Sequence, residues 1–79
     1  MEDYKAAKVL DYKGLACPMP VVKTSMEMKK AVIGDILEIH TTDPGSLADF
    51  PAWARTTGNE LLEIKQETGL IRIFLRKLK

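Results

Sequence analysis

Residues 10–20 read LDYKGLACPMP, a stretch in which a strand, a turn and the start of a helix follow one another. The segment from Ala7 to Tyr12 has the apolar character of a short first strand, and the polar and glycine residues after it predict a turn. Beyond the two prolines, apolar residues recur at helical spacing, so we expect an amphipathic helix over residues 18–32. Its predicted buried face carries Val21, Val22, Ser25, Met28 and Val32.

The rest of the chain predicts one more strand, one more helix and a hairpin. Apolar and polar residues alternate from Ile36 to Thr41, which indicates a half-buried strand. Asp43-Pro44-Gly45-Ser46 combines turn formers with Ser46 as a candidate N-cap, and Gly58-Asn59 is a typical helix end. The second helix therefore lies between them, with Leu47, Phe50 and Ala54 on one face and Pro51 as an irregularity. The hairpin consists of Leu61 to Glu67, a tight turn at Thr68-Gly69, and Leu70 to Leu78.

This order, βαβαββ, decides the expected architecture. Because both helices are amphipathic and each strand has one strongly apolar face, we expect an α+β fold. It is a two-layer α/β sandwich in which two helices cover one face of a four-stranded mixed sheet and the other face meets solvent. In the last strand Ile71, Ile73 and Leu75 should face the helices. No repeat or linker interrupts the sequence, so residues 1–79 should form a single domain.

Charge and cysteine content exclude several classes of function. Twelve Lys and Arg against eleven Asp and Glu give a net charge of +1, so a polyanionic partner would need a local basic patch. The single cysteine excludes an internal disulfide framework and a multi-cysteine zinc site, and we expect no metal and no cofactor. With no signal-peptide pattern at the start, we expect a cytoplasmic monomer that binds neither nucleic acid nor membrane.

The position of Cys17 predicts a reactive thiol. The N-terminal end of a helix carries partial positive charge, which stabilises a thiolate or a persulfide anion. A free cysteine is often a small buried hydrophobe, but Pro18 and Pro20 both fix φ and favour a rigid, exposed junction. Pro20 stands where a thioredoxin-type resolving cysteine would be, and His40, the only histidine, is expected on a strand. A dithiol exchange site and a Cys-His hydrolase are therefore disfavoured.

Four other residues are candidate contributors to this site. Asp11 and Gly14 are predicted to shape the turn before the cysteine, since both residue types favour turns. Asp43 is a weaker candidate for a contact near the sulfur, because an Asp before Pro-Gly is more often a turn residue. Met19 is predicted to be exposed, and its flexible side chain suits successive partners.

With these residues in place, the chain resembles the TusA family of small sulfur-carrier proteins. The hallmark of that family is Cys-Pro-x-Pro at the start of the first helix, which Cys17-Pro18-Met19-Pro20 matches. The resemblance extends over nearly the whole chain. It includes Leu10-Asp11, Gly14-Leu15, Gly34-Asp35, Asp43-Pro44, Asp49-Phe50-Pro51, Gly58-Asn59-Glu60-Leu61 and Arg76-Lys77.

The resemblance implies a sulfurtransferase that accepts sulfane sulfur on Cys17 as a persulfide and passes it to another protein. It further implies a cysteine desulfurase or rhodanese-like donor, and acceptors that serve tRNA thiolation, molybdenum-cofactor synthesis or sulfur oxidation. The implied fold is that of the C-terminal domain of translation initiation factor three. The alternative is a non-enzymatic module in which the Cys17-Pro18 thiolate senses redox state or binds haem.

Overall fold

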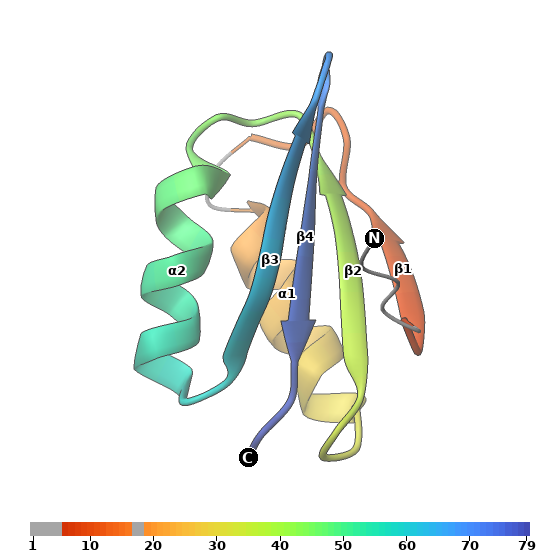
Figure 1. Ribbon diagram of the computed structural model, residues 1–79, viewed down its shortest axis with the longest axis vertical. Coiled ribbons are helices and arrows are strands. Elements are labelled where there is room, and N and C mark those ends of the chain that lie inside the picture. Colours follow the sequence, from red (N-terminus) through yellow and green to blue (C-terminus); the bar gives the residue numbers. More distant parts are fainter. Residues whose placement is uncertain (1–5, 17–18) are drawn as a thin grey trace.

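The computed structural model describes residues 6–16 and 19–79, and it confirms the predicted fold class and element order (Figure 1). Two helices lie against one face of a four-stranded mixed sheet, while the other face is open. Cys17 and Pro18 lie outside the described residues. The elements are β1 (Lys8–Asp11), α1 (Met19–Lys30), β2 (Ile36–Thr41), α2 (Ser46–Thr57), β3 (Glu60–Glu67) and β4 (Leu70–Arg76).

The sheet has the strand order β1-β2-β4-β3. β1 runs parallel to β2, and β4 runs antiparallel to both of its neighbours. Ile39 of β2 lies opposite Leu10 of β1 and Ile73 of β4, so three apolar side chains form one row beneath the helices. Gly69 has φ +71° in the turn between β3 and β4, a conformation that glycine adopts without strain. The predicted hairpin is thereby confirmed.

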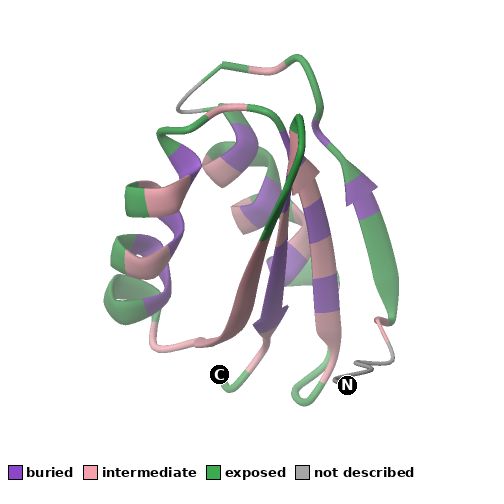
Figure 2. Ribbon diagram, turned by 45° about the horizontal axis from the view of Figure 1, so that its top comes forward, coloured by how far each residue is buried: buried purple, intermediate pink, exposed green. Residues whose placement is uncertain are grey.

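The core lies between the sheet and the two helices (Figure 2). Ile39, Ile73, Leu75 and Phe50 are 0% exposed, so the inner face of the sheet is completely covered at its centre. Phe50 meets Trp53 edge to face, with ring centroids 6.4 Å apart. Burying a side chain of this size contributes about 1.5–3 kcal/mol, so the inner sheet face and α2 supply much of the stability.

The buried face of α1 differs from the predicted one. Pro20, Thr24 and Met28 are the buried residues of this helix, which places one side chain per turn against the sheet. Val22 is 44% exposed and Val32 is 66% exposed, although both were expected inside. Positions four apart share a helix face, and Val22 lies two residues from Pro20, so its side chain projects away from the core.

α1 also ends two residues earlier than predicted, because residues 32–35 form a turn of their own. The amide of Val32 donates to Asp35 Oδ2 at 3.1 Å, and the amide of Asp35 donates to the Val32 carbonyl oxygen at 3.0 Å. Gly34 has φ +97° within this turn. Because Gly34 adopts a left-handed backbone conformation, the helix cannot continue through this turn, which explains why α1 ends at Lys30.

The start of α2 is shifted by one residue from the prediction. Gly45 is the N-cap and Ser46 is the first helical residue, 1% exposed, with its Oγ 3.5 Å from Thr41 Oγ1. The Ser46 side chain therefore contacts Thr41, the last residue of β2, and does not cap the helix. Pro51 lies inside α2, and Gly58, with φ +77°, ends the helix as predicted.

β4 ends at Arg76, two residues before the predicted end. Beyond it the amide of Lys77 donates to the Asp35 carbonyl oxygen at 2.9 Å, and the amide of Leu78 donates to Asn59 Oδ1 at 3.0 Å. These bonds go to the turns that flank the sheet, so the ladder stops at Arg76. Among the described residues, no helix is long and apolar enough to cross a membrane.

The open face of the sheet carries mostly charged side chains, and two of them cover one aromatic ring. Phe74 is 3% exposed, because the Lys65 Nζ and Arg72 Cζ atoms lie 5.6 Å and 5.5 Å from the centre of its ring. Glu38 accepts hydrogen bonds from Arg72 Nε at 3.1 Å and Nη2 at 3.0 Å. Burial alone would raise the pKa of Glu38, but hydrogen bonds from His40 and Arg72 outweigh it and lower that pKa.

Candidate functional site

The loop from β1 to α1 delivers the chain to the Cys-Pro-x-Pro motif, and backbone hydrogen bonds fix its course. The amide of Tyr12 donates to the His40 carbonyl oxygen at 2.8 Å, and that of Leu15 donates to the Tyr12 carbonyl oxygen at 3.2 Å. Asp11 Oδ1 accepts from the Lys13 amide at 3.1 Å, which supports the predicted turn role of Asp11. The loop therefore has a defined shape up to the residues before Cys17.

Gly14 ties this loop to the loop between β2 and α2. Its φ is +84°, and its amide donates to Thr42 Oγ1 at 3.1 Å. A side chain at position 14 would be strained in this conformation, so the turn requires glycine. Sequence reasoning missed Thr42, because a threonine in a loop gives no sign of a partner 28 residues away.

Asp43 lies in the second of these loops and is half-buried. Its amide donates to Thr41 Oγ1 at 3.1 Å, and its Oδ1 accepts from the Gly45 amide at 3.2 Å. The turn role that the sequence favoured for Asp43 is thus present in the structure. The tie between Gly14 and Thr42 places Asp43 in the loop next to the one that precedes Cys17, which keeps it a candidate for a partner contact.

The two described residues of the motif have opposite environments. Pro20 is less than 2% exposed and anchors the first turn of α1 in the core, whereas the Met19 side chain is 42% exposed. The amide of Met19 donates to the Ala16 carbonyl oxygen at 2.9 Å, so this donor is already used within the loop. The loop before the motif is therefore held by hydrogen bonds, and the last residue of the motif, Pro20, is buried in the core.

An apolar strip of three exposed side chains continues from the motif along α1. Met19, Val22 and Met26 are 42%, 44% and 57% exposed. Their spacing of three and four residues puts them on one side of the helix. The strip is therefore continuous with the motif at the start of α1.

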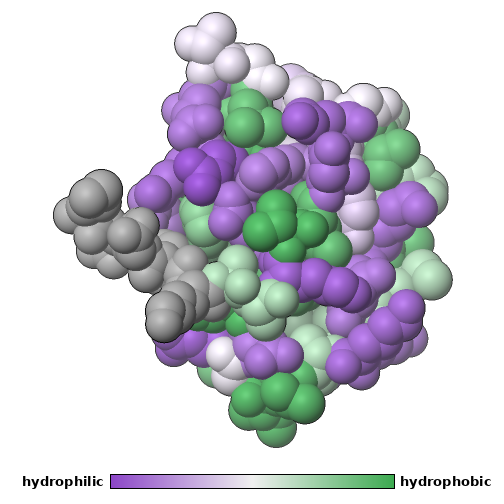
Figure 3. Space-filling model, turned by 90° about the vertical axis from the view of Figure 1, so that its right-hand side faces the viewer, coloured by the Kyte–Doolittle hydropathy of each residue, from purple (hydrophilic) through white to green (hydrophobic). Residues whose placement is uncertain are grey.

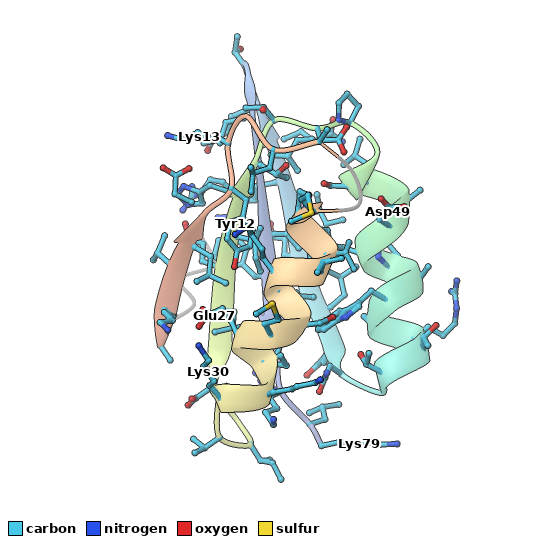
Figure 4. The ribbon with its side chains drawn as sticks, turned by 180° about the vertical axis from the view of Figure 1, so that it is seen from behind. Tyr12, Lys13, Glu27, Lys30, Asp49 and Lys79 are labelled. Carbon is cyan, nitrogen blue, oxygen red and sulfur yellow. The ribbon has the colours of Figure 1, made fainter. Side chains whose placement is uncertain are left out.

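Tyr12, which follows β1, lies on the side of α1 that carries Glu27 (Figure 4). Tyr12 is 9% exposed; burial raises the pKa of its hydroxyl, and the nearby Glu27 carboxylate raises it further. Glu27 accepts a hydrogen bond from Lys8 Nζ at 2.7 Å, which lowers the pKa of Glu27. Tyr12 and Glu27 line a groove of about 160 Å³ with Lys23 and Met26. Met26 belongs to the apolar strip, so this groove adjoins it, and sequence reasoning did not single out its residues as a group.

His40 lies on the open face of the sheet, as expected of a strand residue. Its Nε2 is 2.6 Å from Glu38 Oε2, and its side chain is 22% exposed. α1 covers the opposite face, so the imidazole is directed away from the helix that the motif opens. This geometry gives no support to a role for His40 as a base toward Cys17.

Comparisons with known proteins agree with this arrangement. The family model described as Sulfurtransferase TusA matches residues 8–77. A putative sulfur carrier protein, YrkF of Bacillus subtilis, is 58% identical over 73 residues, which are 92% of this chain but only 40% of YrkF. A second protein of that organism, YrkI, is 45% identical over 73 residues, 92% of this chain and 97% of YrkI.

Two further comparisons add another relative and a solved structure. Sulfur carrier protein TusA of Allochromatium vinosum is 41% identical over 68 residues, 86% of this chain and 90% of that protein. The crystal structure of a SirA-like protein from Desulfitobacterium hafniense superposes with a TM-score of 0.78 at 16% identity, covering 91% of this chain and 99% of that one. The structural likeness supports the fold, and the family match identifies the relationship: this chain belongs to the TusA family of sulfur-carrier proteins.

Proposed function

We propose that Cys17 accepts sulfane sulfur as a persulfide and passes it to an acceptor protein. The observation that carries the proposal is the family match over residues 8–77, within which Cys17 is the only cysteine and precedes Met19, the first residue of α1, by two positions. A helix N-terminal end stabilises an anion, and both the thiolate and the persulfide are anions.

The proposed reaction consists of two balanced exchanges. In the first, the Cys17 thiolate attacks the outer sulfur of a donor persulfide, the donor S–S bond breaks, and the donor leaves as a thiolate. In the second, an acceptor nucleophile attacks the outer sulfur on Cys17, and the Cys17 thiolate is restored. No net oxidation occurs in either exchange. Because the chain has no second cysteine, it has no internal thiol that would release the sulfur.

The fixed course of the chain on both sides of the motif supports a transfer site. The hydrogen bond from Gly14 to Thr42 holds the preceding loop, and the burial of Pro20 holds the first turn of α1. A nucleophile that must meet successive partners gains from a fixed position, because less conformational entropy is lost at each encounter.

Donor and acceptor proteins must both approach Cys17, and the apolar strip of Met19, Val22 and Met26 begins two residues after it in the chain. We assign contacts with both partners to this strip. The proposed donor is a cysteine desulfurase or a rhodanese-type enzyme. The proposed acceptors act in tRNA thiolation, molybdenum-cofactor synthesis or sulfur oxidation, within a reducing compartment such as the cytoplasm that keeps the thiol free.

Intact-mass measurement after incubation with a cysteine desulfurase and cysteine tests the proposal. We expect the chain to gain one sulfur atom, which dithiothreitol removes, and we expect Cys17→Ser to gain none while keeping the same circular dichroism spectrum. Failure of the unmodified chain to take up sulfur from several desulfurases and rhodanese-type donors would contradict the proposal. A haem titration that gives a thiolate-type spectrum, lost in Cys17→Ser, would instead support the sensing alternative.

A further inference from the structure

The turn between α1 and β2 holds two large apolar side chains in water. Val32 is 66% exposed and Ile33 is 69% exposed, the two highest values among the large apolar residues that the structure describes. Leu78, 46% exposed, follows the strand that is bonded to this turn. The turn lies at the end of the molecule opposite to the start of α1 (Figure 1), and Figure 3 shows strongly hydrophobic side chains at that lower end.

Hydrogen bonds hold the backbone of this turn in a defined conformation, so the two side chains are exposed on an ordered turn. Within the turn, Val32 and Asp35 are bonded to each other in both directions through the Val32 amide and the Asp35 amide. The amide of Gly34 donates to the Lys77 carbonyl oxygen at 2.7 Å, and the amide of Lys77 donates to the Asp35 carbonyl oxygen at 2.9 Å. The fold therefore fixes the backbone on which Val32 and Ile33 project.

Four lysines flank this apolar turn in the chain or in the fold. Lys29 and Lys30 end α1 just before it, and Lys77 and Lys79 follow β4, with Lys77 Nζ donating to the Met28 carbonyl oxygen at 2.7 Å. Lys29, Lys77 and Lys79 line one groove between the helices, of about 210 Å³, and Lys30 has a side chain that is 71% exposed. Acidic groups balance part of this charge, since Glu27 lies 4.0 Å from Lys30 and Asp35 lies within the turn. We call the set of Val32, Ile33, Leu78, Lys29, Lys30, Lys77 and Lys79 the basic tip.

Against the expectation from composition that the chain does not bind membrane, we propose that the basic tip docks the protein on an anionic lipid surface, with Val32 and Ile33 in the headgroup region. An apolar turn with lysines around it matches the two components of peripheral membrane binding, apolar insertion and attraction to anionic lipids. The turn projects outward, and a fluid bilayer accepts a convex apolar tip without the matching pocket that a folded partner would need. The near-zero net charge does not oppose this, because the lysines act locally within a Debye length of about 8–10 Å.

The binding would be peripheral and would leave the motif accessible. The proposed contact involves the tip alone, since Val32 and Ile33 are the side chains placed among the headgroups. α1 has 12 residues and is therefore about 18 Å long at 1.5 Å per residue. Since the basic tip follows the C-terminal end of α1 and the motif opens the N-terminal end, a docked chain presents the motif away from the lipid.

Vesicle co-sedimentation tests this proposal independently of sulfur transfer. The full chain is mixed with vesicles of phosphatidylcholine and phosphatidylglycerol in equal amounts, or of phosphatidylcholine alone, at low and high salt. We expect binding only to the anionic vesicles, with at least a tenfold weaker affinity in high salt. Val32→Thr combined with Ile33→Thr should weaken binding at least tenfold, and Ile33→Trp should strengthen it, since tryptophan favours the membrane interface.

Matched variants separate docking from general effects. Val9→Thr removes a 56% exposed apolar side chain on β1, and it should leave vesicle binding unchanged. Lys29→Glu with Lys30→Glu should abolish binding, whereas Lys13→Glu with Lys23→Glu should not, and circular dichroism checks the fold of each variant. The proposal is overturned if the full chain ignores anionic vesicles at low salt. It is also overturned if binding depends on the lysines but not on Val32 and Ile33, which would mean a simple polyanion site.

Discussion

The two helices have the same length, 12 residues each, but α2 buries its aromatic side chains, whereas α1 leaves Met19, Val22 and Met26 exposed. α2 buries an aromatic pair against the sheet, and its face toward solvent carries small or polar residues. α1 buries mainly smaller groups and exposes its apolar strip. The buried residues are Ser46, Phe50, Trp53 and Ala54 in α2, and Pro20, Thr24 and Met28 in α1. The difference teaches that apolar residues in α2 serve packing, whereas many in α1 are available for contact.

Phe50→Ala should have the largest effect on stability. The side chain is 0% exposed, and truncation of such a residue costs about 3–5 kcal/mol through lost burial and a cavity. Met26→Ala on α1 removes a 57% exposed side chain and should change stability by less than about 0.5 kcal/mol. Urea unfolding followed by circular dichroism measures both. Equal losses in the two variants would show that the contrast between the helices is wrong.

Val22→Ser combined with Met26→Ser should reduce sulfur transfer but not folding. If partners cover the apolar strip, losing two apolar contacts lowers affinity about tenfold or more, since each buried CH₂ contributes about 0.8 kcal/mol. Loading rates with a desulfurase at limiting concentration measure the effect, and Val9→Thr is the control on β1. Normal rates in the double variant would remove the strip from the proposed contact surface.

Thr24→Val should stabilise the protein by about 1 kcal/mol. Its hydroxyl oxygen is buried and has no hydrogen-bond partner among the described residues, so replacing it with a methyl group removes a desolvation penalty. Thr41 is the matched control, because it is also 0% exposed but its Oγ1 accepts from the Asp43 amide. Thr41→Val should therefore destabilise by about 1–3 kcal/mol. The urea midpoints of the two variants should move in opposite directions.

Glu27→Gln should have the smallest effect, confined to acid pH. The pKa of Glu27 is lowered in the folded state, mainly by the hydrogen bond from Lys8, so its contribution is present above the ordinary glutamate pKa. That contribution disappears as the pH falls through the lowered folded value. Unfolding midpoints at pH 6 and pH 3 should therefore differ slightly less in Glu27→Gln than in the unmodified chain. A larger pH dependence in the variant would contradict the assignment.

Local patterns in the sequence predicted most of the fold. β2 has its predicted bounds, because strict alternation at Leu37 and Ile39 leaves a single register for a half-buried strand. Gly58 ends α2 as predicted, since the left-handed conformation at a helix end favours glycine. The face of α1 was predicted wrongly at Val22, because periodicity does not distinguish an apolar residue that faces a core from one that faces a partner.

The candidate site was predictable to a smaller extent. Asp11 and Gly14 occupy the turn that their residue types favour, and Met19 is exposed as predicted. The tie to Thr42 joins residues 28 positions apart, so it depends on the pairing of strands and not on local sequence. The roles of Cys17 and Pro18 remain predictions, since both residues lie outside the described part of the chain.

The ring of Phe74 on the open sheet face has a consequence for behaviour in concentrated solution. An uncovered aromatic ring at the centre of a four-stranded sheet would attract the same face of another molecule, which is a first step toward aggregation. Here Lys65 and Arg72 lie over the ring, and a second sheet would have to displace two charged side chains, one of them hydrogen-bonded to Glu38, before it touched the ring. The same groups that bury Phe74 therefore also oppose contact between the open sheet faces of neighbouring molecules.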